Sequence, residues 1–317
     1  MSTDKWFVMG VDLGSTTAKA AVVDQDGALC GADVVQMGAV SREAVARAID
    51  GASIAAGVPR EAIRRTVSTG YGRRLVPGAD RTFTEITCHA RGAAALRPGV
   101  RLVIDIGGQD SKAIIVDDDG LVERFAMNDR CASGTGRFFD VLARALEVDI
   151  EAVGDLALTG ADGLEVSSMC ATFAETEVIS LLAQGQDKAD IAASVHRAVA
   201  ARTLGLIAQV GRATPAVMTG GVAKNPAAIR SVSETLRYPI EVLDQPQIAG
   251  AYGAGLLACD EYRGTRAVLT ARDAAAETKM TPQRPGGQQH CGSCNGVLDG
   301  NHVHAGRPVM LDLQRND

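Results

Sequence analysis

The chain has 317 residues, of which 46% are hydrophobic, and it carries a formal net charge of −6. This composition excludes a disordered chain, and the acidic balance argues against a nucleic-acid-binding surface, which needs a basic stripe. The sequence has no apolar run of the roughly 18 residues that span a membrane. It also has no secretory signal pattern at its start, so we expect a cytoplasmic protein without nucleic-acid or membrane partners.

The first half of the chain begins with a series of expected strands. Residues 6–14 and 17–24 have the apolar patterns of buried strands, and a third strand is expected over 27–37, after a turn that contains Asp and Gly. The range 41–57 is typical of a helix, because it starts with an N-capping serine and ends at a glycine. This alternation of strands and helices predicts an α/β fold.

The opening pattern returns in residues 101–128, which again contain a strand, an Asp- and Gly-rich turn, a lysine and further strands. Three pairs of residues align when one gap is allowed: Asp12 with Asp105, Gly14 with Gly107, and Lys19 with Lys112. Such self-similarity indicates an internal duplication. We therefore expect a first lobe over 1–98, a second lobe over 99–262, and a C-terminal appendage over 263–317, where the composition changes.

The residues at the two matched turns suit the phosphates of a nucleotide. Glycines let backbone N–H groups approach phosphate oxygens, and hydroxyl and lysine side chains add donors and charge. The candidate phosphate-binding residues are Gly14, Ser15, Thr16, Thr17, Lys19, Gly107, Gly108, Ser111 and Lys112. Asp12 and Asp105 are candidates for holding hydrated Mg²⁺ and positioning water, with Gln109 and Glu85 as further catalytic candidates. A single Asp-x-Gly is often only a hairpin turn, but two matched copies favour function.

A third glycine-rich element follows a strand and opens a helix within residues 216–232, and its candidate residues for the adenosine side are Gly220, Gly221 and Lys224. Together with the two turns, this element resembles the phosphate and adenosine loops of the actin-like ATPase superfamily. The resemblance implies an α/β fold of two duplicated actin-like (ribonuclease H-like) lobes around a nucleotide cleft. It implies ATP binding but does not by itself identify a function.

Two of the seven cysteines, Cys131 and Cys170, lie in loops that we expect to lead directly into helices. A helix N-terminus favours a thiolate, which a nucleophile or an iron–sulfur ligand needs. A [4Fe–4S] cluster generally needs four thiolates, so two per chain suggest a cluster shared by two chains. The alternative is that these cysteines are small buried apolar residues, which is our expectation for Cys30, Cys88 and Cys259.

Several longer motifs carry a closer resemblance over about residues 6–260. They are DLGSTTAK, STGYGR, TEITCHARGA, DIGGQDSKAI, MNDRCASGTGRFFDVLA, SSMCATFAETEVISLLAQG, TGGVAKNP and YGAGLLA. These motifs resemble the BadF/BadG/BcrA/BcrD ATPase family. The resemblance implies one [4Fe–4S] cluster between two ATPase subunits, identical or homologous, with Cys131 and Cys170 as the ligands from each chain. It also implies electron transfer from ferredoxin or flavodoxin, driven by ATP hydrolysis, to subunits of an acyl-CoA reductase or dehydratase.

Within this resemblance we expect a benzoyl-CoA reductase type of subunit that serves anaerobic aromatic degradation, because the extra C-terminal segment suggests a permanent complex. The alternative is an activator of an (R)-2-hydroxyacyl-CoA dehydratase. More distant alternatives are a small-molecule kinase of the same fold, which would contain no iron, and a chaperone-like module. In the appendage, the spacing of Cys291, Cys294, His302 and His304 could bind zinc, or the segment could be disordered or pack on a partner.

Overall fold

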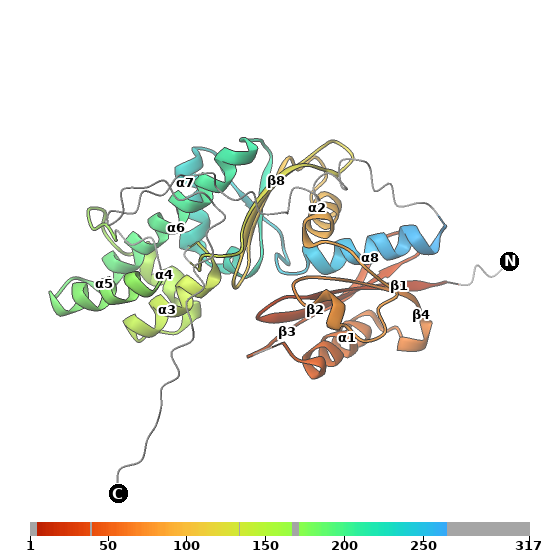
Figure 1. Ribbon diagram of the computed structural model, residues 1–317. Coiled ribbons are helices and arrows are strands. Elements are labelled where there is room, and N and C mark those ends of the chain that lie inside the picture. The colour runs from red at the N-terminus through yellow and green to blue at the C-terminus, as the bar shows by residue number, and fades with distance from the viewer. Residues whose placement is uncertain (1–4, 39, 133, 167–170, 265–317) are drawn as a thin grey trace, which may run out of the picture. The chain divides into compact units, whose positions relative to one another are not determined.

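Two five-stranded sheets form the framework of the protein (Figure 1). The computed structural model describes residues 5–38, 40–132, 134–166 and 171–264. In the first sheet the strand order is β3-β2-β1-β4-β5. Its strands are β1 (Phe7–Leu13), β2 (Thr17–Asp24), β3 (Leu29–Gln36), β4 (Ile63–Thr69) and β5 (Arg81–Thr82).

The second sheet repeats the topology of the first. Its strand order is β10-β9-β6-β7-β8, in which β6 pairs antiparallel with β7 and parallel with β9, as β1 does with β2 and β4. The strands are β6 (Leu102–Ile106), β7 (Ser111–Val116), β8 (Val122–Asn128), β9 (Ala216–Thr219) and β10 (Glu241–Val242). The duplication expected from the sequence is therefore present in both connectivity and pairing direction.

Helices cover both sheets. The α-helices are α1 (Arg42–Ala56), α2 (Glu85–Leu96), α3 (Gly136–Leu146), α4 (Val153–Leu158), α5 (Ala171–Ala183), α6 (Lys188–Val210), α7 (Pro226–Leu236) and α8 (Ala249–Tyr262). The short 3₁₀ helices are η1 (Arg60–Ala62), η2 (Arg73–Leu75), η3 (Ile150–Ala152) and η4 (Gly221–Lys224). The predicted helix start is confirmed at α1, because Ser41 Oγ accepts from the N–H of Ala44 and Gly57 ends the helix in the left-handed region.

The two faces of the first sheet are covered by different helices. Met9 and Val11 pack with α1 on one face, whereas Val8 packs with α8 on the other. This division follows from the alternation of side chains along a strand. Helix α8 thus returns from the end of the described chain to the first sheet (Figure 1).

Helix α2 lies between the cores of the two halves. Its residues Ile86, Ala90 and Ala93 pack with the apolar side chains of one face of the second sheet. On its other side the backbone of α2 meets α8 closely, since a Cβ added at Gly92 would lie 1.9 Å from the carbonyl oxygen of Ala249. Because α2 contacts both halves, its polar residues can act on groups of either sheet.

The lobe boundaries remain a proposal, and the packing of α8 on the first sheet indicates that a first lobe would include this helix. The sequence predicts an apolar face of α3 made of Phe138, Val141, Leu142, Ala145 and Leu146. The structure buries Phe138, Leu142 and Leu146 together with Phe139 and Ala143, whereas Val141 and Ala145 are half-buried. The helix buries a broader stripe because it packs against both α4 and α5.

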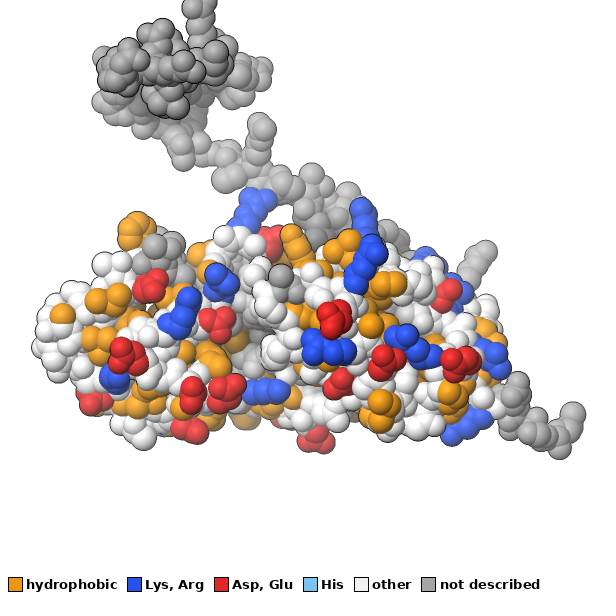
Figure 2. Space-filling model, turned by 90° about the horizontal axis from the view of Figure 1, so that it is seen from below, with side chains coloured by type: hydrophobic (Ala, Val, Ile, Leu, Met, Phe, Trp, Pro, Cys, Tyr) orange, Lys and Arg blue, Asp and Glu red, His pale blue; other side chains and the backbone are white. Residues whose placement is uncertain are grey.

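Among the described residues, α6 is the one helix long and apolar enough to cross a membrane by length and composition alone. However, 56% of its most apolar window is buried inside the protein, which is typical of a core helix. Figure 2 shows acidic and basic side chains interspersed over one face of the described residues. The cytoplasmic location and the absence of membrane and nucleic-acid partners stay predictions.

Candidate functional site

The two aligned aspartates form equivalent ion pairs at the ends of two hairpins. Asp12 on β1 is the cross-strand neighbour of Lys19 on β2, and Lys19 Nζ lies 2.9 Å from Asp12 Oδ2. Asp105 on β6 is the neighbour of Lys112 on β7, with Nζ 3.0 Å from Oδ2. The antiparallel register brings each pair together, because directly opposed residues project to the same face of a sheet. The sequence alignment of Asp12 with Asp105 and of Lys19 with Lys112 therefore corresponds to two equivalent ion pairs in the structure.

The glycines of the two turns serve the turns themselves. The N–H of Gly14 donates to the carbonyl oxygen of Thr17 (3.0 Å), and the N–H of Gly107 donates to that of Asp110 (2.9 Å). These two N–H groups, predicted as phosphate donors, are therefore engaged within the protein. Gly108 has a different role, because a Cβ atom added to it would lie 2.5 Å from Thr16 Oγ1 of the first turn. The two turns consequently lie against each other.

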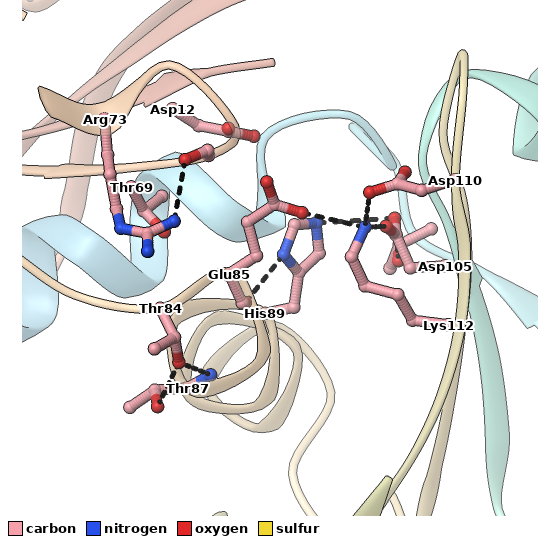
Figure 3. Close-up of polar contacts among 12 residues, drawn as sticks. Asp12, Thr69, Arg73, Thr84, Glu85, Thr87, His89, Asp105, Asp110 and Lys112 are labelled. Atoms are coloured by element: carbon pink, nitrogen blue, oxygen red, sulfur yellow. Dashed lines mark hydrogen bonds and ion pairs between the residues drawn. The ribbon is translucent and has the colours of Figure 1, made fainter. Parts of the chain in front are cut away.

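Lys112 is the centre of a buried cluster of carboxylates. Its Nζ lies 2.7 Å from Asp110, 2.9 Å from Glu85 and 3.0 Å from Asp105 (Figure 3). Burial opposes the charge, but the three carboxylates outweigh it and raise the pKa of Lys112 well above its usual value. Glu85, a water-orienting candidate, is thus placed at the site as an ion-pair partner of Lys112.

His89 is a site residue that the sequence analysis did not identify. It lies one turn after Glu85 on α2, and its Nδ1 is 3.0 Å from the carbonyl oxygen of Glu85, while its Nε2 is 3.3 Å from Asp105 Oδ1 (Figure 3). Burial favours the neutral ring, but Asp105 more than offsets this and raises the pKa of His89 to about 9. The available signal was its i+4 spacing from Glu85 on the same helix face.

Asp105 receives a further hydrogen bond from the third glycine-rich element. Thr219 Oγ1 donates to Asp105 Oδ1 at 2.9 Å. Burial would raise the pKa of Asp105, but His89 and Lys112 hold it well below its usual value. Gly220 follows with φ +86°, and a Cβ there would lie 2.3 Å from the carbonyl oxygen of Ile106, so only glycine fits. The element is therefore brought directly beside the second turn.

The remaining predicted nucleotide residues differ in exposure. Thr17 and Ser111 are buried, Ser15 and Thr16 are half-buried, and Gln109 is exposed. Gly221 and Lys224 are also exposed. These side chains lie on the two turns and on η4, but their roles toward a nucleotide stay predictions. Within the described residues no three His, Cys, Asp or Glu side chains gather to hold a metal ion.

The loop that carries Cys131 is joined to the second turn. Asn128, at the end of β8, accepts from the N–H of Cys131 (3.2 Å) and donates to its carbonyl oxygen (2.8 Å). Helix α3 then begins with Gly136 N–H donating to the carbonyl oxygen of Gly107 and Arg137 N–H donating to that of Gly108, both at 2.8 Å. The cysteine loop is therefore fixed at both ends to the strands and turn of the candidate nucleotide site.

Helix α3 starts later than the sequence suggested. Its N-cap is Thr135, so Cys131 precedes the first turn by several residues. The helix dipole acts mainly within the first turn, and the structure does not place Cys131 in that turn as the sequence suggested. Cys170 lies outside the described residues, as do the tail residues Cys291, Cys294, His302 and His304.

The other described cysteines have local apolar or backbone surroundings. Cys88 is fully buried, and burial raises its pKa to about 12. Cys259 is buried, whereas Cys30 is half-buried rather than enclosed as expected. Desolvation disfavours the thiolate, so Cys88 is suited to packing rather than to ligand chemistry.

Comparison with known proteins agrees with this geometry. The model of the BadF/BadG/BcrA/BcrD ATPase family matches residues 9–258. The activator of lactoyl-CoA dehydratase from Anaerotignum propionicum is 44% identical over 252 residues, which cover 80% of this chain and 97% of the relative. The structure of the activator of the 2-hydroxyisocaproyl-CoA dehydratase from Clostridium difficile, with bound ADPNP, matches with a TM-score of 0.77 and 37% identity, covering 83% of this chain and 98% of that one.

A benzoyl-CoA reductase relative matches less completely. This reductase component, from Thauera aromatica, is 35% identical over 208 residues, which cover 63% of this chain and 73% of the relative. The comparisons thus favour the activator alternative over the benzoyl-CoA reductase interpretation that we preferred from the sequence. They also confirm the expected duplicated actin-like α/β fold. With the paired Asp–Lys turns and the matched range of 9–258, this chain belongs to the BadF/BadG/BcrA/BcrD ATPase family.

Proposed function

We propose that the protein hydrolyses ATP to drive electron transfer, as the activator of a 2-hydroxyacyl-CoA dehydratase. The observation that carries this proposal is the pair of backbone hydrogen bonds from the start of α3 to Gly107 and Gly108. They connect the candidate phosphate turn with the loop of Cys131. The names of the relatives support the choice of partner, and the ADPNP in the Clostridium difficile activator supports ATP as the nucleotide.

The nucleotide phosphates would lie at the two turns, where Lys19 and Lys112 now neutralise Asp12 and Asp105. Phosphate oxygens compete with these carboxylates for the lysine ammonium groups. As the lysines turn to the phosphates, the two aspartates become available to Mg²⁺ and to the attacking water. Two carboxylates with phosphate oxygens are a usual ligand set for Mg²⁺, so these residues fit the ion. Hydrolysis then depends on positioning and charge.

Cys131 and Cys170 would hold a [4Fe–4S] cluster together with the same residues of a second, identical or homologous subunit. Such a cluster supplies transfer of one electron at low potential. The thiol of Cys131 is half-buried in a loop that Asn128 fixes at the backbone, which suits a ligand that must keep one position. A [4Fe–4S] cluster generally needs four thiolates and each chain would supply two, so the proposal requires the second chain.

The protein's own part in coupling follows from its connections. When the second turn moves on binding or hydrolysis, Gly107 and Gly108 move the first turn of α3 with them. The loop of Cys131, held between α3 and Asn128, must then change its position or its exposure. Cluster potentials depend on charge, hydrogen bonding and solvent exposure, so this movement can make the donated electron more reducing. Ferredoxin or flavodoxin would supply that electron, and the dehydratase subunits would receive it.

The cluster assignment can be tested with cysteine variants purified without oxygen. Cys131→Ala protein should lose most of its iron and the associated visible absorbance. Cys30→Ala is the matched control, because Cys30 is also half-buried but lies on β3 of the first sheet, whereas the Cys131 loop follows β8 of the second, and it should retain the iron. A full cluster in Cys131→Ala protein contradicts the assignment.

The partner can be tested separately by supplying reductant, ATP and candidate acceptor enzymes. ATP-dependent dehydration of a 2-hydroxyacyl-CoA is the expected result. Ring reduction of benzoyl-CoA with the corresponding reductase subunits would instead favour the second interpretation. Phosphorylation of a small acceptor by a protein that contains no iron would favour a kinase and overturn the proposal.

A further inference from the structure

His89 connects the helix between the two halves with the second candidate catalytic aspartate. Helix α2 packs on α8 on one side and on the second sheet on the other. From this position the ring reaches Asp105 Oδ1 with Nε2, and Nδ1 faces the carbonyl oxygen of Glu85 (Figure 3). The side chain is almost fully buried, at 7% exposure. Its contacts are therefore set by the packing of α2.

The donors around Asp105 are divided between its two oxygens. Oδ1 receives Nε2 of His89 and the hydroxyl of Thr219, whereas Oδ2 receives Lys112. Lys112 is the donor that incoming phosphates would attract. Once it turns away, Oδ1 stays held by two groups and Oδ2 is left facing the ligand. Asp12 has no comparable second donor among the hydrogen bonds of the described residues, where Lys19 alone is bonded to its carboxylate.

We propose that His89 is a positioning residue for ATP hydrolysis, which holds one oxygen of Asp105 so that the other faces Mg²⁺ and the attacking water. This inference rests on the proposed hydrolysis of ATP. Both ring nitrogens of His89 face oxygen acceptors, so the ring serves as a double donor rather than as an acid or base. Glu85 on the same helix binds Lys112. A shift of α2 therefore changes the contact of His89 with Asp105 and the contact of Glu85 with Lys112 together.

A purely structural role is the main competing explanation, and the chain offers a matched control for it. His196 on α6 is also buried, and its Nδ1 likewise lies close to the carbonyl oxygen four residues earlier, at 2.7 Å. Its Nε2 faces the side-chain amide of Asn225 instead of a carboxylate. The two histidines thus share their burial and their helix contact but differ in what the second nitrogen holds.

The test measures phosphate release by the full chain and by His89→Leu, His89→Gln and His196→Gln. His89→Leu should lower kcat about 100-fold, the size expected for a misplaced catalytic group. KM for ATP should stay within about threefold, because the effect falls on the reaction rather than on ground-state binding. His89→Gln, whose amide N–H can reach Asp105, should recover at least about tenfold of the loss. His196→Gln should leave kcat unchanged.

The outcomes separate the two proposals. Absence of ATP hydrolysis by the unaltered protein refutes the proposed function and this inference with it. Hydrolysis that is undiminished in folded His89→Leu protein, or a loss in which Gln does no better than Leu, overturns the role of His89 alone. If His89→Leu does not fold, Thr219→Val removes the other donor to the same oxygen. It should then show the same selective loss of kcat, and an unchanged kcat would overturn the inference.

Discussion

The two Asp–Lys hairpins have the same strand register but different surroundings. In the first, the buried Asp12 forms one ion pair with Lys19, whose side chain is 14% exposed. In the second, the pair of Lys112 and Asp105 is buried within a set of partners from α2, β9 and the turn itself. Duplication has thus repeated the strands and their pairing, whereas the ion pairs that Glu85 and His89 of α2 form among the described residues are with the second hairpin.

This difference assigns the two hairpins different tasks. Asp105 is fixed before a nucleotide arrives, since donors from three elements define its orientation. Asp12 is held by Lys19 alone among the hydrogen bonds of the described residues and can reorient when that lysine turns to a phosphate. Preorganised groups cost no reorganisation at the moment of reaction. The second hairpin therefore suits a fixed charge, and the first suits a group that adapts to the ligand.

The largest effect is expected from removing either carboxylate charge. Asp105→Asn and Asp12→Asn should each lower kcat for ATP hydrolysis by about 10³-fold, since both lose charge beside the reacting phosphate. Only Asp105→Asn should also lower the unfolding midpoint in urea clearly, because it leaves His89 and Lys112 buried beside fewer negative charges. Equal destabilisation by the two variants would remove the proposed distinction between the hairpins.

The two lysines should differ in what they contribute to the stability of the protein without nucleotide. Lys112→Met should destabilise the protein by about 3–5 kcal/mol, the usual result of removing one partner from buried charges, because three carboxylates lose their common cation. Lys19→Met leaves one carboxylate unpaired instead of three, so its cost should be smaller. Urea unfolding of both variants without nucleotide measures the difference. A larger loss for Lys19→Met would contradict the proposed central role of Lys112.

The comparison of the two hairpins also shows which parts of the site could be predicted from the sequence. The matched pairs of Asp12 with Lys19 and Asp105 with Lys112 were predictable, because the two-residue period of strands fixes which side chains share a face. His89 was not, although its spacing from Glu85 was visible. Its contact with Asp105 depends on how α2 docks between the two sheets, which is a matter of tertiary packing.

Two other differences from prediction have the same origin. Helix α8 packs on the first sheet although more than a hundred residues of the second half precede it in the chain, and no local sequence pattern predicts this contact. The start of α3 was placed too early, because the Gly- and Ser-containing loop before it is long and Thr135 rather than Cys131 lies next to the helix. The family motifs identified the chemistry of Cys131, but its position relative to α3 required the structure.

The smallest predicted effect is a difference between the buried histidines His89 and His196 in how each makes the free energy of unfolding depend on pH. His89 has a pKa raised to about 9, so its contribution to stability is present below the unfolded value of about 6.5 and is lost as the pH rises through 9. Burial lowers the pKa of His196, so the folded state is instead penalised as the pH falls below 6.5. His89→Gln should therefore flatten the alkaline side of a plot of unfolding free energy against pH, and His196→Gln the acidic side. The slope change should reach at most about 1.4 kcal/mol per pH unit, measured by urea unfolding without nucleotide. If both variants changed the same side, the charge of His89 beside Asp105 would not be what separates the second hairpin from the first.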